Sequence, residues 1–245
     1  MTTQQLMDRL GRTRSTLASW QFGQLAVFFV VLLFLLPILH HGVLVKSITT
    51  LFVINTLLVA DSNNPNAREL RWIGWSLAIV AGVSNVLEEL HLSEALTFAT
   101  KYVAITSHAV LFLFCAASIL GIVFRMRRIT LDGILASVVV YELIGLVFAQ
   151  IYTLARLINP VSLQMPPSVA ANTENFQVEM IYYSFVTLAT LGYGDIVPDT
   201  SLTRSVAILE AVIGQFYVAI VVAVLVSAFV AQRMQDQTDS PSDPS

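Results

Sequence analysis

The chain has 245 residues, of which 56% are hydrophobic and only 12% are charged, and its formal net charge is -3. Soluble domains carry about 25% charged residues, so this composition excludes an ordinary soluble protein and favours one embedded in lipid. The weak net charge gives no indication of a nucleic-acid partner.

Long apolar runs of about 20 residues predict helices that cross a bilayer. Six are predicted in chain order, at residues 20–39, 42–60, 72–87, 102–124, 129–154 and 203–232. Before them, residues 1–19 place leucines at helical spacing between arginines, as in a short cytoplasmic helix at the membrane surface. Residues 233–245 are rich in Ser, Asp and Pro and predict a short disordered cytoplasmic tail.

Basic residues predict the orientation, because cytoplasmic loops carry an excess of Lys and Arg. Six crossings place one group on one side: Arg9, Arg12, Arg14, Arg68, Arg71, Arg125, Arg127, Arg128 and Arg233. A smaller group falls on the other side: Lys46, Lys101, Arg156 and Arg204. This bias predicts a multi-pass protein of the cell (plasma or inner) membrane with both termini in the cytoplasm.

Two membrane domains are predicted. Residues 20–128 would form a four-helix transmembrane domain. Its fourth helix lacks the regularly spaced arginines that supply gating charge in voltage sensors, so steep voltage dependence is not expected. Residues 129–232 would form the second domain, with an outer helix, a short re-entrant helix and an inner helix.

The re-entrant element is predicted at residues 178–189, which are apolar but too few to cross a bilayer. The string Thr190-Leu-Gly-Tyr-Gly-Asp195 follows it. Non-helical backbone at membrane depth is tolerated only where it is buried in protein or lines a water-filled path. Two glycines flanking a tyrosine allow successive carbonyls to turn the same way, where they could replace the water around a dehydrated cation.

This string resembles the selectivity-filter signature of the potassium-channel superfamily, with Leu191 where valine is commoner. The resemblance extends over about residues 130–232 to the prokaryotic two-helix ion-channel module, including Tyr141, Gly145 and Tyr152 and the string from Leu209 to Tyr217. It implies an all-α membrane protein with six transmembrane helices plus one re-entrant pore helix and filter loop per subunit. It also implies a homotetramer, because one pore loop supplies a quarter of the ion cage.

The resemblance assigns roles to particular residues. Potassium would be coordinated at the filter backbone by Thr190, Leu191, Gly192, Tyr193 and Gly194, with no other metal and no cofactor. The filter would be supported by Tyr182, Tyr183, Thr187 and Asp195, with Tyr182 donating to Asp195 and Tyr183 or Thr187 holding the Tyr193 hydroxyl. Gly214 falls where the family often places a hinge glycine, and close helix packing is the alternative explanation.

Other polar and apolar positions carry weaker expectations. Five residues at helical spacing are expected to line the inner pore: Val218, Val222, Leu225, Val226 and Phe229. The alternative is that several of them face lipid or neighbouring helices. Glu142 and Glu210 are expected inside helices as candidates for coupling within the membrane. Glu142 would couple the pore to the first four helices or make a structural bond, and Glu210 would bond behind the short re-entrant helix. Asn85 and His108 are expected to pair. Glu88, Glu89, His91 and Glu94 form either a site for protons or a divalent ion or, more simply, a solvated helix end.

The function implied by these features is passive conduction of potassium, and no enzymatic motif is visible. The first alternative is a weakly selective cation channel, which Leu191 and the tyrosines behind the filter leave open. The second is a non-conducting membrane sensor or scaffold with a pore-like fold. The sequence identifies neither the gating stimulus nor a regulatory ligand or partner.

Overall fold

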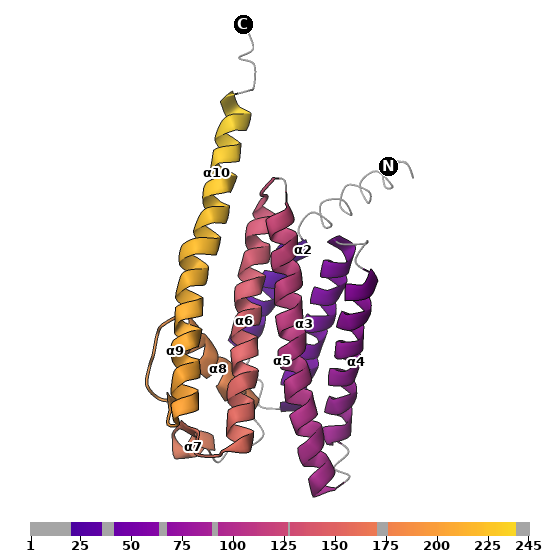
Figure 1. Ribbon diagram of the computed structural model, residues 1–245, viewed down its shortest axis with the longest axis vertical. Helices are drawn as coiled ribbons and strands as arrows, with labels where there is room; N and C mark the ends of the chain where they lie inside the picture. Colours follow the sequence, from indigo (N-terminus) through magenta and orange to yellow (C-terminus); the bar gives the residue numbers. More distant parts are fainter. Residues whose placement is uncertain are drawn as a thin grey trace, which may run out of the picture.

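The protein is described by a computed structural model, which covers residues 21–35, 42–63, 68–89, 93–126, 128–170 and 176–238. The expected surface helix at 1–19, His91 and most of the tail lie outside these residues, as do the side chains of Glu88, Glu89 and Glu94. Within the described residues the protein is almost entirely helical. Figure 1 shows its helices running roughly side by side along the long axis.

The described residues of the first half form α2 (Gln21–Leu35), α3 (Gly42–Asn63), α4 (Arg68–Glu89) and α5 (Glu94–Arg125). The second half begins with α6 (Leu131–Ile158), β1 (Leu163–Gln164), the single turn α7 (Pro167–Ala170) and the short helix α8 (Phe176–Leu188). It ends with β2 (Val197–Pro198), α9 (Ser201–Phe216), the π-helical segment η1 (Tyr217–Val222) and α10 (Ala223–Thr238). The last three elements form one long helix at the edge of the molecule (Figure 1).

Helix starts follow from side chains that satisfy free backbone N–H groups. The Ser93 hydroxyl accepts from the Leu96 N–H at the start of α5, and Thr130 accepts from Gly133 at the start of α6. Thr200 and Thr203 cap α9 reciprocally. The fourth predicted crossing therefore begins eight residues earlier than hydropathy indicated, at Glu94 rather than Tyr102.

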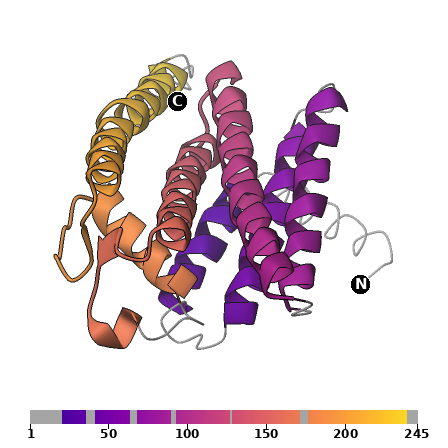
Figure 2. The same cartoon turned by 60° about the horizontal axis from the view of Figure 1, so that its bottom comes forward.

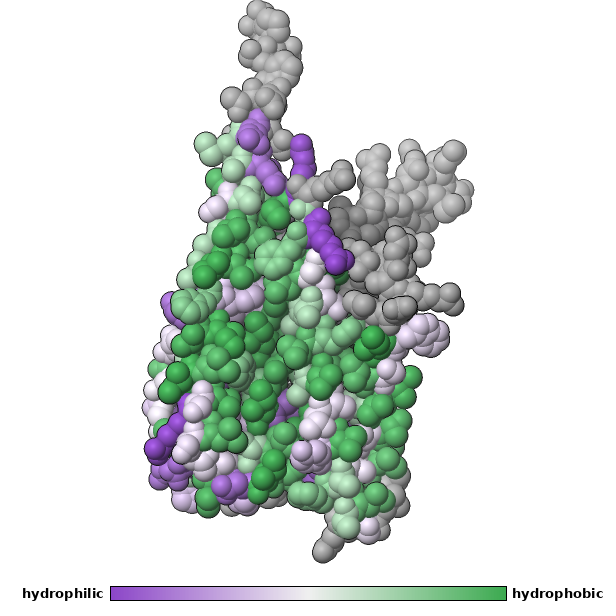
Figure 3. All heavy atoms as spheres, in the orientation of Figure 1, coloured by the Kyte–Doolittle hydropathy of each residue, from purple (hydrophilic) through white to green (hydrophobic). Residues whose placement is uncertain are grey.

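Among the described residues, three helices are long and apolar enough to cross a membrane: α5, α6 and the continuous helix from Ser201 to Gln235. The described parts of α2, α3 and α4 contain shorter apolar stretches, at Gln21–Val31, Thr49–Val59 and Trp72–Leu87. The protein is thus an all-α membrane protein. In Figure 3 hydrophobic side chains cover the middle of the visible face, and hydrophilic ones gather toward its two ends.

Helix α6 joins the two halves of the protein. It packs along α5 and α2 on one side and along α8 on the other, and Figure 2 shows it between these groups. One buried cluster runs continuously from Phe29 and Phe112 in the first half, through Leu143, to Ile181 and Tyr217 in the second. At the start of α6, Asp132 accepts a hydrogen bond from the Gly23 backbone of α2 at 3.0 Å. The two halves of the protein therefore share one hydrophobic core.

Candidate functional site

The string Thr190–Asp195 lies in the loop directly after α8, where sequence reasoning placed it. The loop is held to the last turn of α8 by backbone bonds. Thr190 N–H donates to the Thr187 carbonyl at 2.9 Å, and Leu191 N–H donates to the Val186 carbonyl at 2.8 Å. The chain therefore reverses at the end of the helix, and the following residues run back alongside it toward β2.

The backbone of this loop alternates in handedness. The φ angles of Thr190, Gly192 and Gly194 are +59°, +56° and +80°, whereas Leu191 and Tyr193 keep ordinary negative φ. Alternation of this kind turns successive peptide groups in the same sense, so that like polar atoms lie along one side of the chain. Glycine adopts positive φ readily, but for the β-branched Thr190 it costs about 1–3 kcal/mol and must be imposed by the surroundings.

The loop is uncovered within one chain. Residues 189–195 are all exposed, including the apolar side chain of Leu191 at 57% and the ring of Tyr193 at 66%. Exposed apolar side chains on a strained backbone are unusual on the surface of a monomer and are typical of an interaction site.

The hydrogen bond expected between Tyr182 and Asp195 is present. The Tyr182 hydroxyl donates to Asp195 Oδ2 at 2.6 Å, which links the middle of α8 to the outer end of the loop. This bond, more than burial, raises the pKa of Tyr182 to about 12. The second Asp195 oxygen accepts from the Ile196 backbone at 3.0 Å, so the carboxylate is held from both sides.

The other two expected supports have different partners within one chain. The Thr187 hydroxyl donates to the Tyr183 carbonyl at 2.9 Å. The buried Tyr183 ring packs edge-on against Tyr152, with 4.8 Å between the ring centroids. Neither bonds to the Tyr193 hydroxyl in the described part of the chain. Tyr183 therefore anchors α8 on α6, and the Tyr193 ring remains available to a neighbour.

Polar contacts that sequence reasoning did not identify hold α8 from behind. The Ser184 hydroxyl lies 2.5 Å from Glu210 Oε1 and 2.7 Å from the Gly145 carbonyl, and the Tyr152 hydroxyl donates to Glu210 Oε2 at 2.6 Å. Glu210 was expected to bond behind the short helix, but nothing in the sequence identified Ser184 as its partner. The only available signal was a small hydroxyl on the apolar side of α8.

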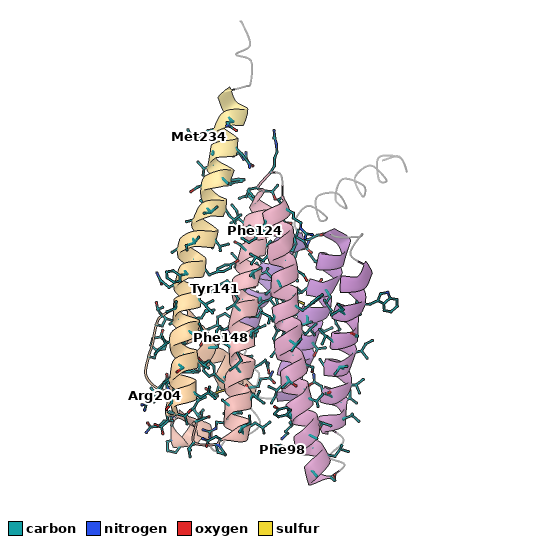
Figure 4. The ribbon with its side chains drawn as sticks, viewed as in Figure 1. Phe98, Phe124, Tyr141, Phe148, Arg204 and Met234 are labelled. Atoms are coloured by element: carbon teal, nitrogen blue, oxygen red, sulfur yellow. The ribbon has the colours of Figure 1, made fainter. Side chains whose placement is uncertain are left out.

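Gly214 lies against the end of α8. A Cβ at this position would overlap the Leu188 carbonyl oxygen, would lie 2.9 Å from Leu188 Cδ1 and would lie 3.1 Å from the carbonyl carbon. The same carbonyl accepts from the Tyr141 hydroxyl of α6 at 3.1 Å, and Figure 4 labels Tyr141 between α6 and α9. This geometry supports the close-packing explanation for Gly214, since only glycine lets the long helix approach so closely.

The loop continues into an outer edge that hydropathy did not predict. β1 and β2 pair antiparallel, with Leu163 opposite Pro198 and Gln164 opposite Val197. The Thr203 hydroxyl donates to the Ser162 carbonyl at 2.8 Å, and Arg156 donates to the Leu163 carbonyl at 3.0 Å. These bonds fix both ends of the segment that contains α8 and the loop.

The five expected lining residues do not share one face of the long helix. Val218 and Val226 are 50% and 41% exposed, whereas Leu225 is only 4% exposed and Val222 packs on the chain's own core. Phe229 is partly buried, with the Arg233 guanidinium 5.3 Å from its ring. The π-helical turn explains the difference, because its extra residue shifts the register of everything after it.

Further polar side chains lie within the helices. Glu142 is almost fully buried on α6, and its Oε2 has no hydrogen-bond partner among the described residues. Asn85 and His108 approach to 3.5 Å, and His108 Nδ1 lies 2.7 Å from the Ala104 carbonyl. Near the C-terminal end of the long helix, the Gln232 side chain of α10 accepts from the Ile129 backbone at 2.9 Å, in the connection between α5 and α6.

Comparison with known proteins finds a family model and a relative that match part of the chain. A family model described as "Ion channel" matches residues 137–231, which begin within α6 and end within α10. The protein is 33% identical over 97 residues to Protein LctB of Geobacillus stearothermophilus, a match that covers 39% of this chain and 72% of that protein. No solved structure matches the chain. The relative is covered over more than two thirds of its length at this identity, so the chain belongs to the same family as that protein, and its residues 137–231 match the ion-channel model.

Proposed function

We propose that four copies of this protein form a potassium-selective channel through which K⁺ moves passively down its electrochemical gradient. The observation that carries the proposal is the alternating backbone of Thr190, Leu191, Gly192, Tyr193 and Gly194 in the string T-L-G-Y-G. Four such loops around an axis would present rings of carbonyl oxygens that replace the hydration shell of K⁺. The Thr190 hydroxyl would add a ligand at the inner end.

The homotetramer follows from what one chain leaves uncovered. The filter loop is exposed, and so are apolar side chains along α9 such as Leu209, Val212 and Phe216. Neighbouring subunits and the bilayer would cover these surfaces, because a single loop supplies only a quarter of an ion cage. The Tyr193 ring would then find its partner in the assembly rather than on its own α8.

The first four helices are proposed to regulate the pore without steep voltage dependence. Within α5 the described charged side chains lie toward its ends, at Lys101 and Arg125, so little fixed charge could move through the membrane field. The Ile129–Gln232 bond ties the connection that follows α5 to the inner end of the long helix, so a movement of α5 could be passed to α10 through this connection. Val218 and Val226 are the proposed lining residues, and Glu142 is a candidate for coupling α6 to its neighbours.

The test is ion flux from liposomes that contain the purified protein, with potassium and sodium gradients compared. Gly192→Ala places a Cβ at φ +56°, which costs roughly 1–2 kcal/mol in each subunit. Gly121→Ala on α5 is the matched control, because nothing lies within 4 Å of its added Cβ. The proposal expects potassium-driven flux that Gly192→Ala abolishes and the control retains.

The other outcomes distinguish the alternatives. Equal sodium and potassium flux that still depends on Gly192 would favour the weakly selective cation channel. Absence of flux under every gradient, together with a monomer or dimer in detergent, would favour a non-conducting sensor or scaffold.

A further inference from the structure

Glu210 is the most completely buried acidic side chain among the described residues, with no exposed surface. It lies where α6, α8 and α9 meet, directly behind the helix that carries the filter loop. Its Oε2 accepts from the Tyr152 hydroxyl of α6 at 2.6 Å, and its Oε1 lies 2.5 Å from Ser184 Oγ of α8. Ser184 Oγ in turn lies 2.7 Å from the Gly145 carbonyl of α6.

A count of hydrogens shows how these contacts can be satisfied together. The Ser184 hydroxyl carries one hydrogen, and a carbonyl oxygen carries none. If Glu210 were an ionised carboxylate, Ser184 could donate to Glu210 or to Gly145, and the other short contact would join two acceptors. If Glu210 carries a proton on Oε1, it donates to Ser184 Oγ, and the Ser184 hydrogen goes to the Gly145 carbonyl.

Among the described residues, no cationic side chain bonds to the Glu210 carboxyl. The side chains that bond to the Glu210 carboxyl are Ser184 and Tyr152, and neither is cationic. The other titratable groups facing it are Tyr141 of α6 and Tyr183 of α8. A charge buried at membrane depth without a cationic partner is costly, whereas a neutral carboxyl with every hydrogen bonded is not.

We propose that Glu210 is a positioning residue for the filter and that it works as a neutral carboxylic acid. Its proton completes a one-way relay from Glu210 through Ser184 to the Gly145 carbonyl, which fastens α8 to α6 and α9 at once. The close approach that this needs is possible because Gly145 has no side chain: a Cβ there would lie 2.7 Å from the Phe185 ring. This role rests on the proposed function, since it concerns selectivity at the loop that α8 carries.

Position 186 bears on the same point. Val186 offers no side-chain hydrogen bond behind the loop, although its carbonyl receives the Leu191 N–H. The side-chain support for α8 comes instead from two residues earlier in the helix, where Ser184 faces Glu210. A shift of Ser184 would move α8 as a unit, together with the Thr187 and Val186 carbonyls that hold the loop.

The test compares Glu210→Gln with Glu210→Leu in the full-length protein in liposomes. The glutamine amide can donate to Ser184 and accept from Tyr152, so it preserves the relay, and the potassium-to-sodium flux ratio should stay within about twofold of wild type. Leucine has neither group, and the ratio should fall by about tenfold or more. Wild type should lose selectivity at alkaline pH as the proton leaves, whereas Glu210→Gln should not. A glutamine variant as impaired as leucine, or with the same pH profile as wild type, would overturn the proposal.

Infrared spectroscopy reads the proton without any flux. Wild type should show the carbonyl band of a protonated carboxyl that Glu210→Gln removes, measured against Glu142→Gln as a second buried carboxyl in the same membrane domain. A spectrum unchanged by Glu210→Gln would refute the neutral carboxyl even if the channel is selective. Conversely, Glu210→Gln could remove the band while the wild-type protein shows no potassium selectivity. That result would uphold the neutral carboxyl and refute the proposed function.

Discussion

Replacing Gly214 by alanine places one methyl group between the long helix and the end of α8. The added Cβ would overlap the Leu188 carbonyl oxygen and would lie 2.9 Å from Leu188 Cδ1. Carbon and oxygen atoms in weak contact settle at about 3.3–3.6 Å, so the two helices must separate by roughly 1 Å. Because the oxygen belongs to the backbone, no side-chain rotation relieves the clash, and the Tyr141 bond to the same oxygen is lengthened as well.

The cost can be estimated from two opposing effects. Overpacking in a tightly packed interior costs about 1–3 kcal/mol, and the better helix propensity of alanine returns about 1 kcal/mol. We expect a net destabilisation of about 1 kcal/mol in each subunit, concentrated at the residues that hold the filter loop. Gly121→Ala gains the same propensity in open space and should be neutral or slightly stabilising.

Thermal unfolding in detergent and the potassium-to-sodium flux ratio measure the two consequences. If Gly214 acts by packing, Gly214→Ala lowers both the midpoint of unfolding and the flux ratio. If it acts only as a hinge, the substitution changes how often the channel opens and leaves the flux ratio intact. A Gly214→Ala protein that matches Gly121→Ala in both measurements would refute the packing argument.

Three further predictions concern contacts around the pore. Tyr182→Phe removes the hydrogen bond to Asp195, worth about 0.5–1.5 kcal/mol, and should lower the flux ratio about two- to tenfold. The bond raises the pKa of Tyr182 to about 12, so its stabilisation is fully present below about pH 10 and is lost as pH rises through about 12. The difference between variant and wild type should therefore be constant across neutral pH, and a difference that vanished there would contradict the assignment. In a background without the native cysteine, Val226→Cys should react with a water-soluble thiol reagent and Leu225→Cys should not, and equal reactivity would contradict the observed register. Gln232→Leu breaks the contact between the α5–α6 connection and α10, so single-channel recording should show a changed open fraction at unchanged selectivity, whereas a loss of selectivity would place that contact in the filter support instead.

Local sequence signals predicted the parts of the protein that depend on short spans of chain. The short helix was expected at residues 178–189 and spans Phe176–Leu188, because a half-length apolar run between prolines and glycines has few other structures available. The Tyr182–Asp195 bond was likewise expected. In contrast, the start of α5 was placed too late, because hydropathy does not register a polar first turn capped by Ser93.

Features that depend on partners far apart in the sequence could not be predicted in the same way. Glu210 lies 26 residues from Ser184 and 58 residues from Tyr152 in the chain. Only the packing of α6, α8 and α9 brings the three together. The register of the long helix could not be predicted for a different reason. Helical spacing assumes a constant register, and the π-helical turn at Tyr217–Val222 shifts the residues after it, so Leu225 points into the subunit.

The geometry of the loop at Thr190–Asp195 and the proposed assembly of subunits stabilise each other. Thr190 holds a positive φ that a β-branched residue adopts only under constraint, and within one chain the constraint consists mainly of backbone bonds to Thr187 and Val186. The side chains that follow, Leu191 and Tyr193, are largely exposed. Any neighbour that buries them stabilises the strained backbone, and by linkage a loop already in that geometry presents the right surface to the neighbour. The strain at Thr190 therefore argues that the loop and the oligomer form together, with α8 supplying the fixed base on which both are built.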